Sequence, residues 1–136
     1  MRDTHTGTKK GDILLIDDDP AVLRVLGAIL AKEGYGLSSA AQGRTGLKAA
    51  KEELPDLILL DIGLSDLDGI EVCRRLKTDK RTSAIPVIFI SGRKEEEDKI
   101  RGFEAGGVDY IGKPFEFPVL LARIKALERR TLGAAS

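Results

Sequence analysis

The chain has 136 residues, of which 42% are hydrophobic and 32% are charged, and its 22 basic and 22 acidic side chains balance to a formal charge of zero. This length suits one domain with its own core, and the lack of a basic excess argues against a nucleic-acid or membrane-surface binder. One cysteine, Cys73, allows no intrachain disulfide, and no apolar run approaches the roughly 20 residues that span a bilayer, so we expect a reduced, cytoplasmic protein.

The first third of the chain predicts a tail, a strand and a helix. Residues 1–11 are polar and rich in Gly, Thr and Lys, which is typical of a disordered tail. The apolar run 13–16 predicts a strand buried on both faces. Asp19 and Pro20 predict a helix start, with Asp as the N-cap and Pro in the first turn, and Gly34 predicts its end. Its expected inner face, at three- and four-residue spacing, comprises Val22, Val25, Leu26, Ile29 and Leu30.

The remaining segments alternate in the same way. The polar segment 35–40 predicts an edge strand, and apolar runs at 57–60, 87–90 and 108–111 predict three further strands. The intervening patterns predict helices at 43–53, 69–77, 95–105 and 119–130. In the charged helix at 95–105, Ile100 and Phe103 are the expected apolar anchors.

Five strands alternating with five helices predict an α/β fold with a single doubly wound parallel sheet, and the common strand order for this flavodoxin-like class is 2-1-3-4-5. We divide the chain into a disordered N-terminal tail at 1–11, one domain at 12–131 and a C-terminal tail or linker at 132–136. In such sheets the site lies beyond the carboxyl ends of the strands, where the strand order reverses.

Polar residues follow the predicted strands at that edge. Asp17 and Asp18 come after the first strand, Asp61 follows the third, Ser91 the fourth and Lys113 the fifth. Three carboxylates in one crevice need compensating positive charge, of which Lys113 supplies one unit. Oxygen ligands without nearby His or Cys favour Mg²⁺ over zinc. The sequence therefore predicts a Mg²⁺ site that in turn binds a phosphoryl group.

Simpler roles compete for individual residues. Capping the first helix explains Asp19 but needs only one aspartate of the three. A surface lysine at Lys113, a turn at Ser91 and a packed strand tyrosine at Tyr110 are each ordinary in isolation. The convergence of four strands on carboxylates, a hydroxyl and an amine is what favours a site.

The segments ILLIDDDPAVL, PDLILLDIGLSDLDGIEVCRRLK, IPVIFISG and GGVDYIGKPF resemble the receiver domain of two-component response regulators, over about residues 12–130. The resemblance implies that Asp61 is the phosphoacceptor. It implies a Mg²⁺ (or Mn²⁺) site formed by Asp17, Asp18, Asp61 and the backbone carbonyl of Gly63. It also implies that Ser91 and Lys113 bind the phosphoryl oxygens, that Tyr110 is the switch aromatic, and that the bond before Pro114 is cis.

The implied function is a signalling domain rather than an enzyme, with only self-phosphorylation and slow autodephosphorylation. A sensor histidine kinase or His-phosphotransfer protein would phosphorylate Asp61 in a Mg²⁺-dependent reaction, and the domain would switch conformation within a two-component phosphorelay. We expect a phosphorylation-dependent homodimer through the face formed by 95–105, 108–111 and 119–130. A stand-alone receiver and the N-terminal part of a longer protein are both compatible with this sequence.

The chain departs from the family's usual pattern in two loops. Ser65 and Asp66 stand where Pro-Gly is common, and we expect Asp66 to add negative charge near the site entrance. Gly107 stands where Ala is frequent. Gly63 and Arg93 occupy the two positions that tend to govern how water reaches the phosphate, and neither offers a general base.

Three other functions remain as alternatives. An aspartyl phosphohydrolase would need a second acid/base carboxylate, but Gly63 stands two residues after Asp61. Such an enzyme would also need a cap over its substrate, and no insertion in this sequence is long enough to form one. A flavodoxin-like cofactor binder would need a Gly/Ser/Thr-rich phosphate loop after the first strand, where this chain has aspartates. A receiver-shaped module that is never phosphorylated would not need the intact set of Asp61, Ser91 and Lys113.

Overall fold

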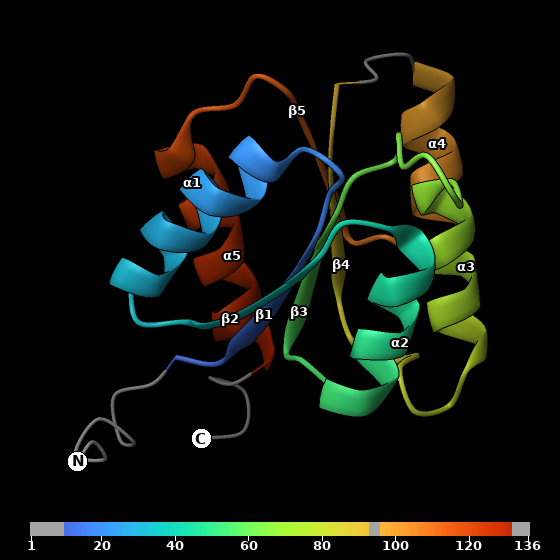
Figure 1. Ribbon diagram of the computed structural model, residues 1–136, viewed down its shortest axis with the longest axis horizontal. Coiled ribbons are helices and arrows are strands. Elements are labelled where there is room, and N and C mark those ends of the chain that lie inside the picture. The colour runs from blue at the N-terminus through green and yellow to red at the C-terminus, as the bar shows by residue number, and fades with distance from the viewer. Residues whose placement is uncertain (1–9, 93–95, 132–136) are drawn as a thin grey trace.

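The computed structural model describes residues 10–92 and 96–131, and these form one parallel sheet between two layers of helices (Figure 1). The strand order is β2-β1-β3-β4-β5, which confirms the predicted α/β fold. The strands are β1 (Asp12–Ile16), β2 (Gly36–Ala40), β3 (Leu57–Leu60), β4 (Val87–Ser91) and β5 (Asp109–Gly112). The helices are α1 (Pro20–Lys32), α2 (Gly43–Glu53), α3 (Gly69–Thr78), α4 (Glu96–Glu104) and α5 (Phe117–Thr131).

Each face of the sheet has its own hydrophobic core. Helices α1 and α5 cover one face, and α2, α3 and α4 cover the other (Figure 1). Successive residues of β3 alternate between them: Leu57 and Leu59 join the α1/α5 core, whereas Ile58 and Leu60 join the opposite core. Burial on both faces is the physical reason why β3 and most of β1 and β4 are continuous apolar runs, unlike the edge strand β2, whose sequence is GLSSA.

Helix α1 begins as its sequence predicts but presents a narrower apolar stripe. Asp19 accepts a hydrogen bond from the backbone N–H of Ala21 at 2.9 Å, and Pro20 is the first helical residue. Leu26 and Leu30 are buried, but Val25 is 56% exposed, so its predicted place on the inner face is wrong. Val25 follows Arg24 on the solvent side, while the rows through Leu26 and Leu30 face the sheet.

Helix α4 packs with the opposite side to the one predicted. Ile100 and Phe103 are 50% and 49% exposed, so they do not anchor the helix, and Gly102 and Ala105 are buried instead. The cause is Phe89 on β4: a Cβ on Gly102 would lie 3.0 Å from its ring, and one on Gly107 would lie 2.5 Å from it. A large side chain on the sheet thus requires small residues above it, which also accounts for glycine at position 107.

None of the helices formed by residues 10–92 and 96–131 is long and apolar enough to cross a membrane. The segments predicted to be tails lie mostly outside the described residues, which begin at Lys10 and end at Thr131.

Candidate functional site

The carboxyl ends of β1 and β3 bring three aspartates together. Ile16 pairs with Leu60 in the sheet, and the backbone N–H of Asp61 donates to the carbonyl of Ile16 at 2.9 Å. The strands therefore end level, and Asp17 and Asp61 leave them side by side. One carboxylate oxygen from each of Asp17, Asp18 and Asp61 lies within 4.8 Å of the others.

Lys113 reaches this cluster from the end of β5. Its Nζ lies 2.7 Å from Asp17 Oδ2 and 3.6 Å from Asp61 Oδ2. The Lys113–Pro114 peptide bond is cis, and the Lys113 N–H donates to the carbonyl of Ser91 at 2.8 Å. Burial lowers the pKa of Lys113, but the hydrogen bond to Asp17 and the charges of Asp61 and Asp17 outweigh burial and raise this pKa above its ordinary value.

The charge balance of the cluster favours a divalent cation. Asp17 and Asp61 are only 5% and 8% exposed, while Asp18 is open to solvent. Among residues 10–92 and 96–131, one ammonium group, that of Lys113, faces the three carboxylates. Within the described part of the chain, this is the only group of three or more acidic, His or Cys side chains close enough to share a metal ion. An all-oxygen, partly solvated set of this kind fits Mg²⁺, which keeps several of its waters.

The loop after Asp61 turns tightly around that residue. The Gly69 N–H donates to the carbonyl of Ile62 at 2.8 Å, and a Cβ on Gly69 would lie 2.1 Å from the carbonyl oxygen of Asp61. Only glycine fits at that contact. Gly63 lies exposed in this loop, with its N–H 3.3 Å from Asp61 Oδ1. The Gly63 carbonyl therefore belongs to the loop that directly follows Asp61, one of the three aspartates of the cluster.

Asp66, which the sequence predicts to add negative charge near the site entrance, has both of its carboxylate oxygens engaged at the start of α2. Its Oδ1 accepts from the N–H of Gly43 at 2.8 Å and its Oδ2 from the N–H of Arg44 at 3.0 Å, so it caps α2. These backbone hydrogen bonds lower the pKa of the Asp66 carboxyl. The sequence carried only an indirect signal of this cap. The residue before α2, Gln42, makes no side-chain hydrogen bond to the helix, so the cap has to come from elsewhere in the chain.

The two switch candidates lie on neighbouring strands: Ser91 ends β4, and Tyr110 is the second residue of β5. Ser91 is 1% exposed at the end of β4, one strand away from Asp61. Tyr110 is half-buried, with its ring centroid 6.1 Å from that of Phe89 and 5.9 Å from Lys99 Nζ. Arg93 lies outside the described residues. The structure thus brings Asp17, Asp18, Asp61 and Lys113 into contact and places Ser91 beside them.

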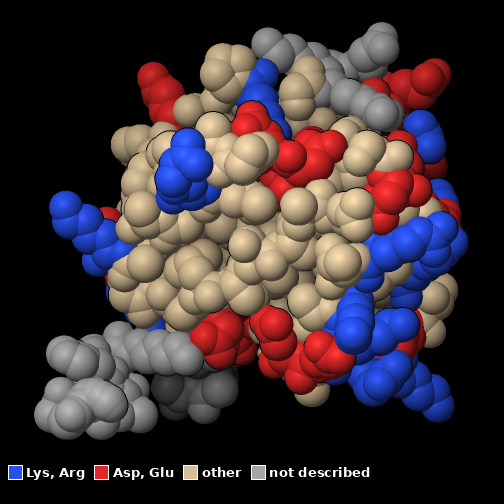
Figure 2. Space-filling view, in the orientation of Figure 1, with Lys and Arg blue, Asp and Glu red and all other residues tan. Residues whose placement is uncertain are grey.

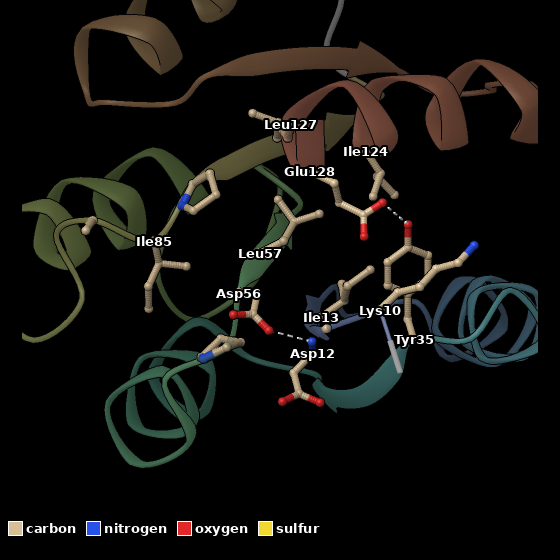
Figure 3. A pocket seen from close by; sticks show the side chains of 14 residues that line it. Lys10, Asp12, Ile13, Tyr35, Asp56, Leu57, Ile85, Ile124, Leu127 and Glu128 are labelled. Atoms are coloured by element: carbon tan, nitrogen blue, oxygen red, sulfur yellow. Dashed lines mark hydrogen bonds between the residues drawn. The ribbon is translucent and has the colours of Figure 1, made fainter. Parts of the chain in front are cut away.

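A hollow lined by β1, β3 and α5 lies at the other end of the sheet. It has a volume of about 260 Å³ and an apolar floor that includes Ile13, Leu57 and Ile124 (Figure 3). Two pairs of its polar groups are hydrogen-bonded: Tyr35 Oη donates to Glu128 Oε1 at 2.8 Å, and the Asp12 N–H donates to Asp56 Oδ2 at 2.8 Å. None of the acidic cluster lines this hollow.

Comparison with known proteins points to one family. Residues 13–125 match the family described as the response regulator receiver domain. The chain is 44% identical over 119 residues to the DNA-binding dual master transcriptional regulator RpaA of Synechocystis sp., covering 88% of this chain and 49% of that protein. It is 43% identical over 117 residues to the response regulator PleD of Caulobacter vibrioides, covering 86% of this chain and 26% of that protein. The chain thus spans about half the length, or less, of these relatives.

Solved structures of the same kind share the fold. A CheY-like receiver domain protein from Methanospirillum hungatei JF-1 matches with a TM-score of 0.83 at 32% identity, covering 88% of this chain and 94% of that one. The BeF3-activated N-terminal receiver domain of Klebsiella pneumoniae RstA matches with a TM-score of 0.81 at 31% identity, covering 87% and 98%. Together with the acidic crevice at the carboxyl ends of the strands, these matches show that the chain belongs to the receiver domain family of two-component response regulators.

Proposed function

We propose that Asp61 accepts a phosphoryl group from a partner histidine kinase or His-phosphotransfer protein in a Mg²⁺-dependent reaction. The observation that carries the proposal is the convergence of Asp17, Asp18 and Lys113 on Asp61. Asp17, Asp18, Asp61 and the carbonyl of Gly63 would hold Mg²⁺ (or Mn²⁺), whose charge offsets that of the phosphoryl oxygens.

The transfer needs little from the protein beyond position and charge. A carboxylate oxygen of Asp61 forms the new P–O bond while the P–N bond of the donor phosphohistidine breaks, and the electron pair returns to the imidazole nitrogen. Lys113, already 3.6 Å from Asp61 Oδ2, is placed to pair with a phosphoryl oxygen. Gly63 has no side chain to orient water, which suits an acyl phosphate that is lost slowly.

The phosphoryl group would then bias a two-state element. Ser91 donates its hydroxyl to a phosphoryl oxygen, and the half-buried Tyr110 turns inward into the space this vacates. This follows the general requirement that a ligand favour one pre-existing state by differential contacts. Phe89, between β3 and Tyr110, packs against both α4 and this ring, so that a change at Tyr110 reaches α4.

The face formed by α4, β5 and α5 suits a second copy of the domain. Ile100, Phe103 and Val108 are large apolar side chains exposed on it, and Arg123 pairs with Asp109 at 2.7 Å across α5 and β5. Light scattering should give a larger mass for the wild type in the presence of beryllofluoride than in its absence. Phe103→Ser should abolish this increase, whereas Val25→Ser, an equally exposed site on α1, should leave it intact. An increase that survives Phe103→Ser would contradict the proposed face.

The test of the phosphoacceptor is intact mass after incubation with acetyl phosphate and Mg²⁺. The wild type should gain one phosphoryl group, and both Asp61→Asn and addition of EDTA should prevent the gain. Asp56→Asn is the matched control, because Asp56 directly precedes β3, whereas Asp61 directly follows the other end of that strand. A phosphoryl group that persists in Asp61→Asn would overturn the assignment.

A further inference from the structure

Helix α2 takes its N-terminal cap from a distant loop. Both carboxylate oxygens of Asp66 accept hydrogen bonds from its first amides, at 2.8 Å from Gly43 N and 3.0 Å from Arg44 N. The local residue, Gln42, has the extended backbone of an N-cap but makes no side-chain hydrogen bond to the helix. The side chain of Asp66 therefore ties the loop that follows Asp61 to α2, and it supplies the N-cap that the local residue does not.

Helix α2 is in turn seated directly on β1. A Cβ on Gly46 would lie 2.6 Å from the side chain of Ile16, the residue before Asp17, so the helix backbone rests on that strand. At the helix start, a Cβ on Gly43 would lie 3.0 Å from the carbonyl oxygen of Leu67. Strand β1 and the loop after β3 are therefore both packed tightly against α2.

Gly63 lies between two fixed points of that loop. On one side, the N–H groups of Leu64 and Gly69 both donate to the carbonyl of Ile62, at 2.9 and 2.8 Å, which closes the base of the loop. On the other side, Asp66 ties the loop to α2. Gly63 is thus held relative to β1 by two routes: the hydrogen bond from the Asp61 N–H to the carbonyl of Ile16, and the contacts that run through Asp66 and α2.

We propose that Asp66 is a positioning residue for the metal site: through α2, it fixes the distance between the Gly63 side of the site and the Asp17/Asp18 side. The inference rests on the proposed function, since it takes the carbonyl of Gly63 as a ligand. Groups that orient metal ligands from behind typically change metal affinity by about 10- to 100-fold when removed. Asp66→Ala should therefore weaken metal binding about tenfold, although Asp66 does not touch the ion.

The competing explanation is that Asp66 only stabilises α2, and a compensating variant separates the two. Asp66→Ala removes both the cap and the tether. Adding Gln42→Asp supplies α2 with a local N-cap, because position 42 has the required backbone, but leaves the loop untied. Asp66→Asn keeps one acceptor oxygen and should weaken binding less than Asp66→Ala.

The experiment is titration with Mn²⁺, followed by the electron paramagnetic resonance signal of the free ion, together with thermal unfolding and amide hydrogen exchange. We expect Asp66→Ala to weaken Mn²⁺ binding about tenfold and to speed exchange at Gly43 and Arg44. The double variant should regain wild-type thermal stability and slow amide exchange at Gly43 and Arg44, but it should not regain Mn²⁺ affinity. Recovery of affinity together with stability would overturn the inference, and so would an unchanged affinity in Asp66→Ala. Failure of the wild type to bind Mn²⁺ would instead contradict the proposed function itself.

Discussion

The two ends of the sheet both carry carboxylates but use them differently. Acidic atoms gather at the upper and the lower edge of the molecule in Figure 2. At the amino ends of the strands, two carboxylates each have their own donor: Asp56 accepts from the Asp12 N–H, and Glu128 accepts from Tyr35 Oη (Figure 3). At the carboxyl ends, Asp17, Asp18 and Asp61 converge, with Lys113 as the cation that contacts two of them.

The contrast between paired and converging carboxylates distinguishes structural from functional groups better than the size of a cavity does. The hollow beside Tyr35 has a volume of about 260 Å³, but two pairs of its polar groups are already hydrogen-bonded. In the acidic cluster, by contrast, the described residues set one ammonium group, that of Lys113, against three carboxylates. Buried charge that its neighbours do not compensate marks where a charged ligand belongs.

The largest expected effect is on metal affinity. Asp18→Ala should weaken Mg²⁺ binding by about 100-fold or more, because a lost ligand costs at least as much as a lost supporting group. Asp56→Ala, at the other end of the sheet, should leave Mg²⁺ affinity unchanged. Calorimetric titration of both variants checks this. Similar affinities in wild type and Asp18→Ala would remove the distinction between the two ends.

The next effect is on stability at the carboxyl ends. Lys113→Met should lower the free energy of unfolding by about 2 kcal/mol without metal, since it leaves Asp17 and Asp61 facing each other; full burial would cost more, but Lys113 keeps 23% of its side chain exposed. Saturating Mg²⁺ should recover most of this loss, because the metal replaces the missing positive charge. Urea unfolding with and without Mg²⁺ measures both values. A loss that Mg²⁺ does not reduce would argue that Lys113 acts only through packing.

A smaller effect is expected at the amino ends. Tyr35→Phe removes the hydrogen bond to Glu128 while keeping the buried ring, and should lower the free energy of unfolding by about 1 kcal/mol. Mg²⁺ should not recover this loss, which is the contrast with Lys113→Met. The same urea series measures it. Recovery by Mg²⁺ would show that the two ends are coupled through the sheet.

Local sequence rules predicted the elements and the site because both depend on short segments. Apolar runs give strands buried on two faces, Asp19 and Pro20 start α1, and the topology of a parallel sheet gathers strand-end residues at one edge. Placing Asp17 beside Asp61 required the common strand order of this fold class, in which strands 1 and 3 are neighbours, but no contact between individual side chains.

What the sequence did not predict depends on pairs of residues far apart in the chain. Ile100 and Phe103 have helical spacing that is compatible with a buried face, but Phe89 occupies the space beneath α4 and turns them outward. Asp66 resembles a loop carboxylate, and only the placement of α2 shows its role as a cap. Such complementarity is set by packing between elements, which periodicity within one element does not contain.

The smallest expected effect concerns alkaline pH and separates the two ends by their titration. The pKa of Tyr35 is raised above its ordinary value of 10.0, by burial first and then by Glu128, and that of Lys113 is raised above 10.5. A group with a raised pKa in the folded state contributes stability that is complete below its unfolded pKa and is lost as pH rises through the folded pKa. The contribution of Tyr35 should therefore decline from about pH 10, and that of Lys113 about half a unit later.

The measurement is the difference in free energy of unfolding between wild type and each variant, taken from pH 8 to pH 11. Cys73, whose pKa burial raises to about 11, and Lys77, whose pKa burial lowers, titrate alike in all these proteins and cancel in the differences. The gap between wild type and Tyr35→Phe should shrink by about 0.8 kcal/mol by pH 10.5, and the gap for Lys113→Met should shrink by less. If the Lys113→Met gap closed first, the hydrogen bond and charges at the carboxyl ends would not hold the ammonium form, and the balance of charge on which the site is argued would be wrong.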